Sequence, residues 1–302
     1  MTRTGRTSFR TLLWSGWVVG ALLLLPVAGG PVYLPVVAGT ALALALVPGT
    51  LPTTSRVRDR ADLVAIAVLY LSVVALMRLA FVVFTVADVL GLFLAFAAAL
   101  LLGVAGPLYY SVWIRRRPLS DLGLRGDNLR RTAVLALGFG AVQFALTLWG
   151  YDLPAPVDWV PLLCMSLVVG VFESVFFRGF VQNRLEAQLG PVLGIAVAAA
   201  LYGGYHVGFG MGGDAILFLT GLGVVYAVAF TLARNLLVLW PLLTPLGSFY
   251  ASVQAGDIEL PWASIAGFAD VFGLMVLAGW LAARRHRRYL AGPRPPSPAA
   301  HA

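Results

Sequence analysis

The sequence contains no lysine and only one cysteine, and charged residues of any kind make up 11% of its 302 residues. Soluble domains are about one-quarter charged, so this shortage of charge excludes an ordinary soluble fold. The single Cys164 excludes an internal disulfide, and we interpret it as a small packing residue in an apolar helix. Apolar residues are abundant instead: 60% of the chain is hydrophobic and the mean hydropathy is +0.89. This composition indicates an integral membrane protein.

The apolar residues fall into runs of about 20, each long enough to cross roughly 30 Å of hydrocarbon as a helix. We therefore predict an all-α, polytopic transmembrane bundle of about ten helices, with little chain left for a soluble domain. The expected spans are residues 11–29, 32–50, 63–84, 89–113, 132–150, 159–182, 191–208, 215–233, 236–254 and 264–283.

All 21 basic residues are arginine, and they cluster in alternate connectors between the predicted spans. The opposite connectors contain no basic residue at all. This asymmetry follows the positive-inside rule and predicts that the N and C termini are both cytoplasmic. We interpret the net charge of +8 as a topology signal rather than a nucleic-acid-binding surface. We expect a multi-pass protein of the cell membrane, and specifically of a bacterial plasma membrane.

The start of the chain has the charged and apolar regions of a signal peptide, with an alternative cleavage site at Val27-Ala28-Gly29. We expect an uncleaved first helix, because the apolar run is long and a second span follows at once. Along the chain we predict leading transmembrane helices over residues 1–114 and a functional core over 115–283. Residues 284–302 are predicted to form a basic, proline-rich disordered tail.

A few ionisable residues fall inside the predicted spans, where an arginine or aspartate at a helix centre costs about 2.5–3.5 kcal/mol. Such groups normally face the bundle interior and mark function. Arg78 is interpreted as a snorkelling residue or as the ion-pair partner of Asp88 or Asp270. The others are Glu173, Arg178, His206 and Asp270, of which Asp270 is interpreted as an interhelical hydrogen-bond partner.

Glu173 and Arg178 lie on one predicted helix, and Tyr202 and His206 are i and i+4 neighbours on a later one. The acid and the base are either a buried ion pair that fixes helix packing or part of a site. A lone histidine in a span is either a core hydrogen-bonding residue or a ligand. The glycines that allow a neighbouring helix to approach His206 closely are Gly203, Gly204 and Gly208.

The segment E-S-V-F-F-R-G-F, which begins at Glu173, resembles the first motif, E-E-x-x-x-R-G-F, of the CPBP family. These are the CAAX-protease and bacteriocin-processing intramembrane metalloproteases. Y-G-G-Y-H, which ends at His206, resembles the second motif, F-x-x-x-H, and residues 117–125 are similar to the connector that precedes the family core. The resemblance covers about residues 115–255, and the order and separation of the motifs make it more specific than either motif alone.

The resemblance implies an intramembrane metalloendopeptidase in which Glu173 is the general base that activates water. It implies that Arg178 orients the site and that His206 binds the metal or faces the oxyanion. A zinc ion held in part by His206 and Glu173 is the expected cofactor. The expected partners are a membrane-associated peptide or protein substrate and the lipid bilayer, with no nucleic acid.

The sequence departs from the family pattern within each motif. Ser174 replaces the second glutamate, Tyr202 replaces the phenylalanine, and Thr244 and Ser248 replace the histidine and asparagine of the third motif. Catalytic zinc normally takes three protein ligands, and hydroxyl groups are poor ones. One alternative is therefore a proteolytically inactive scaffold or binding protein. A small-solute transporter ranks last, because no pair of repeats occupies corresponding halves of the chain.

The two motif helices bring their polar groups together only if the first continues to about Arg184 and buries Arg178. We predict that arrangement, with a turn at residues 185–190. The Glu173 carboxylate is then expected within reach of His206, directly or through one water or ion.

Overall fold

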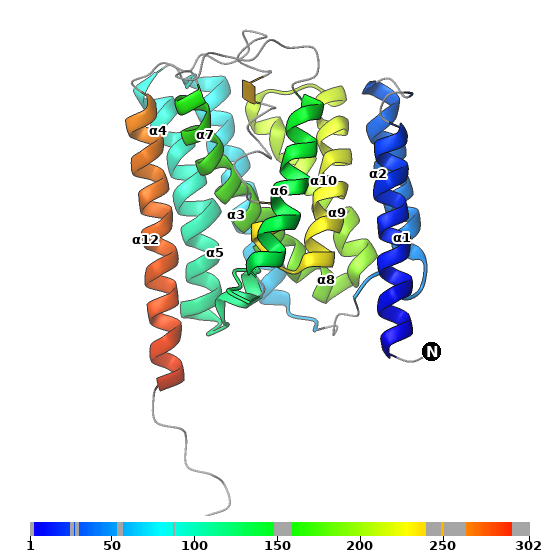
Figure 1. The fold of residues 1–302 in the computed structure, drawn as a ribbon. Coiled ribbons are helices and arrows are strands. Elements are labelled where there is room, and N and C mark those ends of the chain that lie inside the picture. The colour runs from blue at the N-terminus through cyan, green and yellow to red at the C-terminus, as the bar shows by residue number, and fades with distance from the viewer. Residues whose placement is uncertain are drawn as a thin grey trace, which may run out of the picture.

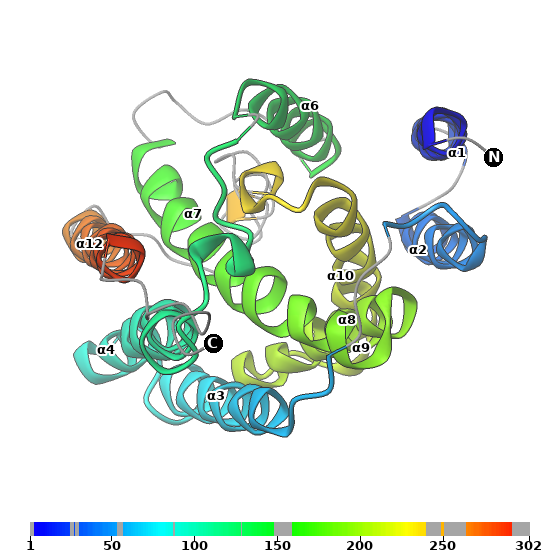
Figure 2. The ribbon, with the colours of Figure 1, turned by 90° about the horizontal axis from the view of Figure 1, so that it is seen from below.

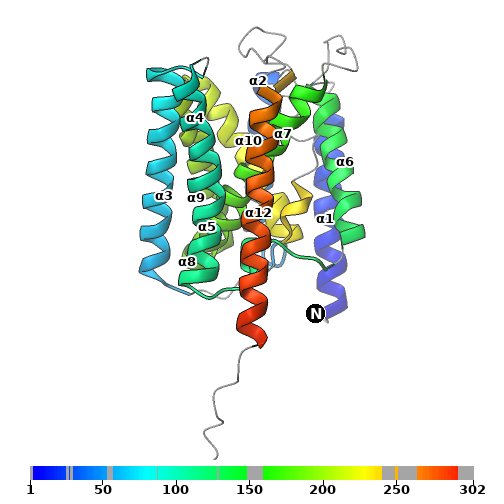
Figure 3. The same ribbon diagram turned by 90° about the vertical axis from the view of Figure 1, so that its left-hand side faces the viewer.

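The computed structural model describes residues 3–24, 27, 30–52, 57–86, 88–127, 129–147, 159–239, 249–250 and 264–291. Most of these residues are helical, and no strand occurs among them. The helices lie side by side with their axes roughly aligned (Figures 1 and 3), which confirms the predicted all-α bundle. In the described ranges, 6 helices are long and apolar enough to cross a membrane, and two shorter apolar helices accompany them. The chain is thus a multi-pass membrane protein.

Several helices are continued by π-helical or 3₁₀ segments, labelled η. The bounds are α1 Arg3–Leu24, α2 Gly30–Leu46, α3 Arg60–Arg78 with η1 Leu79–Val83, α4 Val89–Ala97 with η2 Ala98–Ala105, α5 Gly106–Tyr109 and η3 Tyr110–Ile114, η4 Leu119–Leu122, α6 Leu129–Thr147, α7 Trp159–Glu173 with η6 Ser174–Gln182 and α8 Asn183–Leu189, α9 Pro191–Gly204 with η7 Tyr205–Phe209, α10 Gly213–Ala233, η8 Leu236–Val238, and α12 Ser264–Ala291. Counted as continuous rods, the long helices of the described residues number nine, close to the ten expected.

The expected span at residues 236–254 accounts for the difference. Its first described residues form a single 3₁₀ turn, η8, which begins after Asn235 because the Asn235 side chain accepts a hydrogen bond from the Leu237 N–H group. Residues 249–250 are helical, and the remainder of that predicted span lies outside the described residues. At the other end of the chain, α12 continues to Ala291, so the first eight residues of the predicted tail are helical.

The outer helices present apolar side chains outward, as lipid requires. On α3, Val64, Val68 and Leu71 are 61%, 57% and 64% exposed, and their spacing of four and three residues makes one helical stripe. Ile66 and Met77 of the same helix are buried on the opposite side. A helix that is apolar on both faces suits a bundle in hydrocarbon, with one face on lipid and one on protein.

The rod formed by α7, η6 and α8 crosses the middle of the bundle (Figure 2). In its most apolar stretch 56% of the residues are buried, against 22% for α3 and for α12. The rod ends at Leu189, Gly190 turns the chain with φ 89°, and Pro191 starts α9. This confirms the predicted continuation to about Arg184, with Arg178 2% exposed. The turn predicted at residues 185–190 is wrong over residues 185–189, which are helical.

Two hydrophobic clusters hold the helices together. The larger one joins the central rod to residues of α3, η2, α9 and α12, and Cys164 packs against it as expected. The smaller one joins α1 and α2 to α9 and α10 through Trp14, Ala41 and Ile195. Helices before and after residue 115 share the larger cluster, so the predicted division there stays a prediction about order along the chain, not about packing.

The arginine-bearing connectors lie at one end of the bundle, at the bottom of Figure 1. Main-chain hydrogen bonds tie them together: Val57 donates to the Ala187 carbonyl and Leu236 to the Gly123 carbonyl, each at 2.9 Å. That these connectors share one end agrees with the sequence pattern. Which side of the membrane this end faces stays a prediction.

Gly179 allows the connector of residues 117–125 to pack directly on the central rod. A Cβ atom at Gly179 would lie 2.5 Å from the carbonyl oxygen of Leu122, a backbone atom that has no freedom to turn away. Position 179 therefore has no room for a residue larger than glycine.

Gly179→Ala is predicted to lower the free energy of unfolding by about 1–3 kcal/mol, because the added methyl group forces the connector away from the rod. Thermal unfolding of the purified protein in detergent measures the effect. Gly273→Ala is the matched control, since a Cβ there meets nothing within 4 Å. Equal unfolding temperatures for the two variants would contradict the close packing.

Candidate active site

Glu173 ends α7, and its carboxylate is held by two tyrosines of the neighbouring helix. The Tyr202 hydroxyl donates to Oε2 at 3.0 Å, and the Tyr205 hydroxyl donates to Oε1. Both tyrosines are buried, at 4% and 1% exposure, whereas Glu173 is partly exposed. Hydrogen bonds to an ionised acceptor are stronger than neutral ones, so the two phenols stabilise a carboxylate in an apolar setting. Both oxygens of Glu173 are thus hydrogen-bonded, while the side chain keeps some exposed surface.

The π-helical segment η6 brings Arg178 to the same side of the rod as Glu173. At 3.6 residues per turn, groups five apart would point about 140° away from each other. A π-helix instead bonds residues five apart, as the Asn183 N–H group does with the Arg178 carbonyl, so such residues lie about one turn apart on one side. The Arg178 guanidinium lies over the Tyr202 ring, 4.9 Å from its centroid.

The buried ion pair considered for Glu173 and Arg178 does not form between these described residues. Both side chains contact Tyr202 instead: its hydroxyl donates to the Glu173 carboxylate, and its ring face contacts the Arg178 guanidinium. A cation over an aromatic face is worth about 2 kcal/mol when desolvated. Arg178 therefore acts on the carboxylate through the tyrosine between them.

His206 lies in the 3₁₀ segment that continues α9, with its ring against that of Tyr205 at a centroid distance of 4.0 Å. Its Nδ1 atom is 2.9 Å from the Tyr202 carbonyl oxygen, which can only accept, so Nδ1 carries the proton. Nε2 is then the ring nitrogen with a lone pair, which a ligand or a water molecule can use. His206 is 6% exposed.

Helix α3 holds the turn around His206 from the outside. The Tyr70 hydroxyl donates to the Leu201 carbonyl and the Arg78 guanidinium to the Val207 carbonyl, both at 3.1 Å. Close approach is possible because Cβ atoms at two of the predicted glycines would clash with α3, Gly204 with Tyr70 and Gly208 with Met77. Among the described residues Arg78 makes no ion pair with an aspartate, so the pairing considered for it is not formed.

Glu173 and His206 lie at about the same height in the bundle. Glu173 is sixteen positions before the end of its rod at Leu189, and His206 is fifteen positions after the start of α9 at Pro191, so the two lie similarly far along the chain from the turn at Gly190. No hydrogen bond or ion pair joins the two within the described part of the chain. Both instead contact Tyr202 and Tyr205. The predicted direct contact is absent, and a contact through water or an ion stays a prediction.

Comparison with known protein families finds a match over the part of the chain that contains this site. Residues 155–243 match the model of the type II CAAX prenyl endopeptidase Rce1-like family. Over these residues the chain is therefore similar to that family, in agreement with the resemblance of its motifs to the CPBP family. No curated protein and no solved structure matches the chain. The match contains Glu173, Arg178 and His206 and ends one residue before Thr244.

Three polar residues of this CPBP-like core were missed by the sequence reasoning: Tyr205, Gln182 and Glu186. Tyr205 had a signal, because it is three residues from Tyr202 and adjacent to His206 in the same motif. Glu186 had been placed in a surface turn, yet it is 0% exposed and lies within α8. Glu186 was missed because its segment was predicted to be a turn, whereas the helix continues through it.

The donors described in the core do not complete a zinc site. No group of three or more His, Cys, Asp or Glu side chains able to hold a metal ion occurs among the described residues. Glu173 and Nε2 of His206 could supply two ligands, against the three protein ligands that catalytic zinc normally takes. Thr244 and Ser248 lie outside the described residues.

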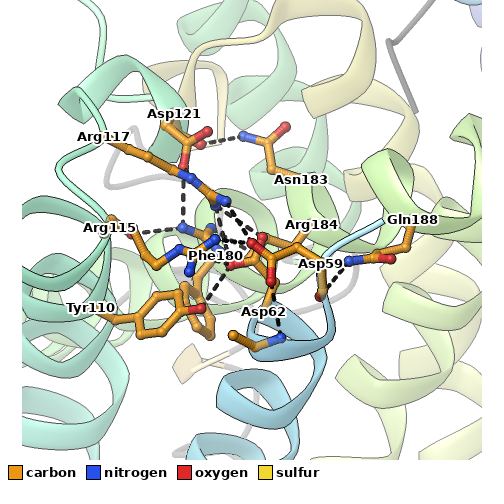
Figure 4. Close-up of polar contacts among 12 residues, drawn as sticks. Asp59, Asp62, Tyr110, Arg115, Arg117, Asp121, Phe180, Asn183, Arg184 and Gln188 are labelled. Carbon is orange, nitrogen blue, oxygen red and sulfur yellow. Dashed lines mark hydrogen bonds and ion pairs between the residues drawn. The ribbon is translucent and has the colours of Figure 1, made fainter. Parts of the chain in front are cut away.

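A second polar cluster anchors the arginine-bearing end of the central rod (Figure 4). Arg184 is 2% exposed and donates to Asp121 at 3.1 Å and to the Ser111 hydroxyl at 2.7 Å. Its Nε atom is 3.8 Å from Asp62, the residue that also accepts from Arg117 and from Tyr110. The remaining members are Asp59, Arg115 and Gln188. The cluster joins α3, the 117–125 connector and α8, and so fixes the end of the rod.

Arg184→Leu is predicted to destabilise the protein by about 3 kcal/mol, because the buried Asp62 and the partly exposed Asp121 lose a charged partner that the leucine does not replace. Chemical unfolding of the purified variant measures this. Arg60→Leu removes an exposed arginine at the same end and should change the stability by less than about 0.5 kcal/mol. Equal losses in the two variants would show that the cluster adds nothing specific.

Proposed function

We propose that the chain is a CAAX-protease-like intramembrane endopeptidase that hydrolyses a peptide bond of a membrane-associated peptide or protein. The observation that carries the proposal is the Glu173 carboxylate, partly exposed inside a transmembrane bundle and held by two neutral donors rather than by a counterion. An ionised acid kept in this way has its charge stabilised without a permanent positive partner, which suits a general base. The family of residues 155–243 supports the same activity.

In the proposed reaction, Glu173 takes a proton from water as the water oxygen adds to the carbonyl carbon of the scissile bond. The carbonyl π bond breaks and its oxygen becomes an oxyanion. When the tetrahedral intermediate collapses, the C–N bond breaks and the leaving amine takes the proton that Glu173 holds. The products are a new carboxylic acid, which ionises by passing its proton to the new amine, and Glu173 returns to its starting state.

His206 is proposed to orient the attacking water. With Nδ1–H bound to the Tyr202 carbonyl, the neutral imidazole presents the Nε2 lone pair, which accepts one hydrogen of a water molecule. The other hydrogen then faces the Glu173 carboxylate, and a water between the two groups accounts for their lack of direct contact. Tyr202 and Tyr205 hold the carboxylate in place during the proton transfer.

A proteolytically inactive binding protein is the second candidate. It is favoured by the donor set, since the described residues supply fewer than the three ligands typical of catalytic zinc. In that case the same polar site would bind a membrane peptide without cleaving it. Activity of the Glu173 variant below separates the two functions.

Glu173→Gln is predicted to abolish hydrolysis, with a loss of about 100-fold or more, because an amide does not accept the proton of water. The assay reconstitutes the protein in lipid vesicles with solubilised membrane peptides in heavy-oxygen water. Mass spectrometry then counts new C termini that carry the heavy oxygen. Asp214→Asn, which removes an exposed carboxylate at the start of α10, is the control and should retain activity.

Cleavage by Glu173→Gln within about twofold of the unaltered protein would exclude Glu173 as the base. Binding of peptides with no cleavage by any form of the protein would favour the inactive binding protein. Membrane abundance of each variant shows whether it folds.

Tyr205→Phe is predicted to lower kcat by about 10- to 100-fold with little change in KM, since a hydrogen bond to a charged group is worth about 1.5–3 kcal/mol. The phenyl ring keeps the contact with His206. Steady-state kinetics on the most rapidly cleaved peptide from the same assay measure both constants. Tyr109→Phe, at an exposed tyrosine outside the site, is the matched control. An unchanged kcat for Tyr205→Phe would remove the phenol from the mechanism.

A further inference from the structure

A line of buried polar side chains runs along the central rod from the candidate active site toward the arginine-bearing end. Arg178, Gln182 and Glu186 are spaced four residues apart and are 2%, 0% and 0% exposed. The Arg178 Nη1 atom is 3.5 Å from Gln182 Oε1, and Gln182 Nε2 is 2.7 Å from Glu186 Oε1. Nothing in the proposed reaction uses the last two residues, so their polarity inside the bundle calls for another reason.

The orientation of the Gln182 amide is dictated by its neighbours. Its nitrogen faces Glu186 Oε1 at 2.7 Å, the Ala227 carbonyl at 2.8 Å and the Thr231 hydroxyl at 2.9 Å. A carboxylate and a carbonyl only accept, so the amide nitrogen has to be on this side. The amide oxygen therefore points at Arg178.

The Glu186 carboxylate is in turn fully bonded. Oε1 accepts from Thr231 at 2.6 Å as well as from Gln182, and Oε2 accepts from Arg234 at 2.5 Å. Arg234 caps α10 with φ 51°, a left-handed conformation that is unfavourable for a residue other than glycine. Its ion pair with Glu186 stabilises that conformation, so Glu186 and the end of α10 fix each other.

Arg178 has few other partners. Its Nη2 atom is buried and has no hydrogen-bond partner among the described residues, and Nη1 donates to Gln182 Oε1. The guanidinium also lies over two aromatic rings, 4.9 Å from the centroid of Tyr202 and 6.0 Å from that of Tyr226. If the amide oxygen is removed, only these ring faces are left to hold the guanidinium in its present position.

We propose that Gln182 and Glu186 are positioning residues for the reaction: Glu186 orients the Gln182 amide, and the amide oxygen holds Arg178 over Tyr202, the donor to Glu173. The inference rests on the proposed function, because it concerns the same carboxylate. It adds residues that lie two and three helical turns away from Glu173 and do not touch the reacting atoms.

A double-mutant cycle between positions 178 and 182 tests this. Gln182→Met keeps the volume and removes the amide, and Arg178→Lys keeps the charge and removes the planar guanidinium. We expect Gln182→Met to lower kcat about tenfold with KM within about twofold, and the double variant to be no slower than Arg178→Lys alone. Ser166→Ala is the matched control on the same rod, at a buried hydroxyl with no partner among the described residues. It should leave kcat unchanged.

Losses that multiply in the double variant, or a Gln182→Met variant as active as Ser166→Ala, overturn the inference. If Gln182→Met does not accumulate in the membrane, Thr231→Val replaces it, since it keeps the side-chain shape and removes the hydroxyl that contacts both Gln182 Nε2 and Glu186 Oε1. We expect Thr231→Val to lower kcat severalfold with KM within about twofold, because the Gln182 amide is then less firmly oriented. A folded Thr231→Val variant as active as Ser166→Ala also overturns the inference.

Glu173→Gln, assayed in parallel, separates the two proposals. Full activity of that variant overturns the proposed function and the inference together. An inactive Glu173→Gln with multiplying losses at positions 178 and 182 overturns the inference alone.

Discussion

Every charge inside this bundle has to be compensated by protein, because hydrocarbon offers no hydrogen bonds. The central rod carries four such groups, and they are compensated differently. Arg184 pairs with aspartates and Glu186 pairs with Arg234, so both have partners of opposite charge. Arg178 has the Gln182 amide oxygen and the Tyr202 ring, and Glu173 has two phenol hydroxyls; neither has a counterion in contact among the described residues. Of the two acids on the rod, only Glu173 lacks a basic partner in the described part of the chain, and this difference is why we propose Glu173, and not Glu186, as the reactive group.

The close contacts of the fold follow from the need to build these partners around one rod. Tyr202 and Tyr205 reach Glu173 because α9 starts directly after Gly190 and runs back alongside the rod to the same height. At Gly203 a Cβ atom would lie 2.7 Å from the Ile216 carbonyl oxygen, and at Gly194 it would lie 2.6 Å from the Glu186 backbone. Such glycines bring the backbones of α8, α9 and α10 together, which places short polar side chains within bonding distance across helices. In this core, the same close helix packing therefore also makes the polar contacts between helices possible.

The sequence predicted the helices and the main site residues for the same physical reason. Long apolar runs specify spans, and a glutamate, an arginine or a histidine within a run is conspicuous because it is costly there. Tyr205 was missed because a tyrosine in a membrane helix is not costly in the same way. The approach of Arg178 to the Tyr202 ring was missed because it depends on a π-helical segment, and the apolar pattern does not reveal where a helix changes from one hydrogen-bonding register to another.

The polar core also bears on the choice between an enzyme and an inactive binding protein. Replacing a buried polar network by well-packed apolar residues is often neutral or stabilising, so a bundle that served only as a scaffold would gain nothing from Glu173, Arg178 and Gln182. This chain lacks the histidine of the third motif, yet it keeps a carboxylate, two phenols, an imidazole and a guanidinium in contact on two helices. Groups that each reduce the stability of a membrane bundle are retained together where they share one chemical task. A carboxylate near an imidazole nitrogen that has no protein partner among the described residues is the arrangement for which we propose hydrolysis over binding alone.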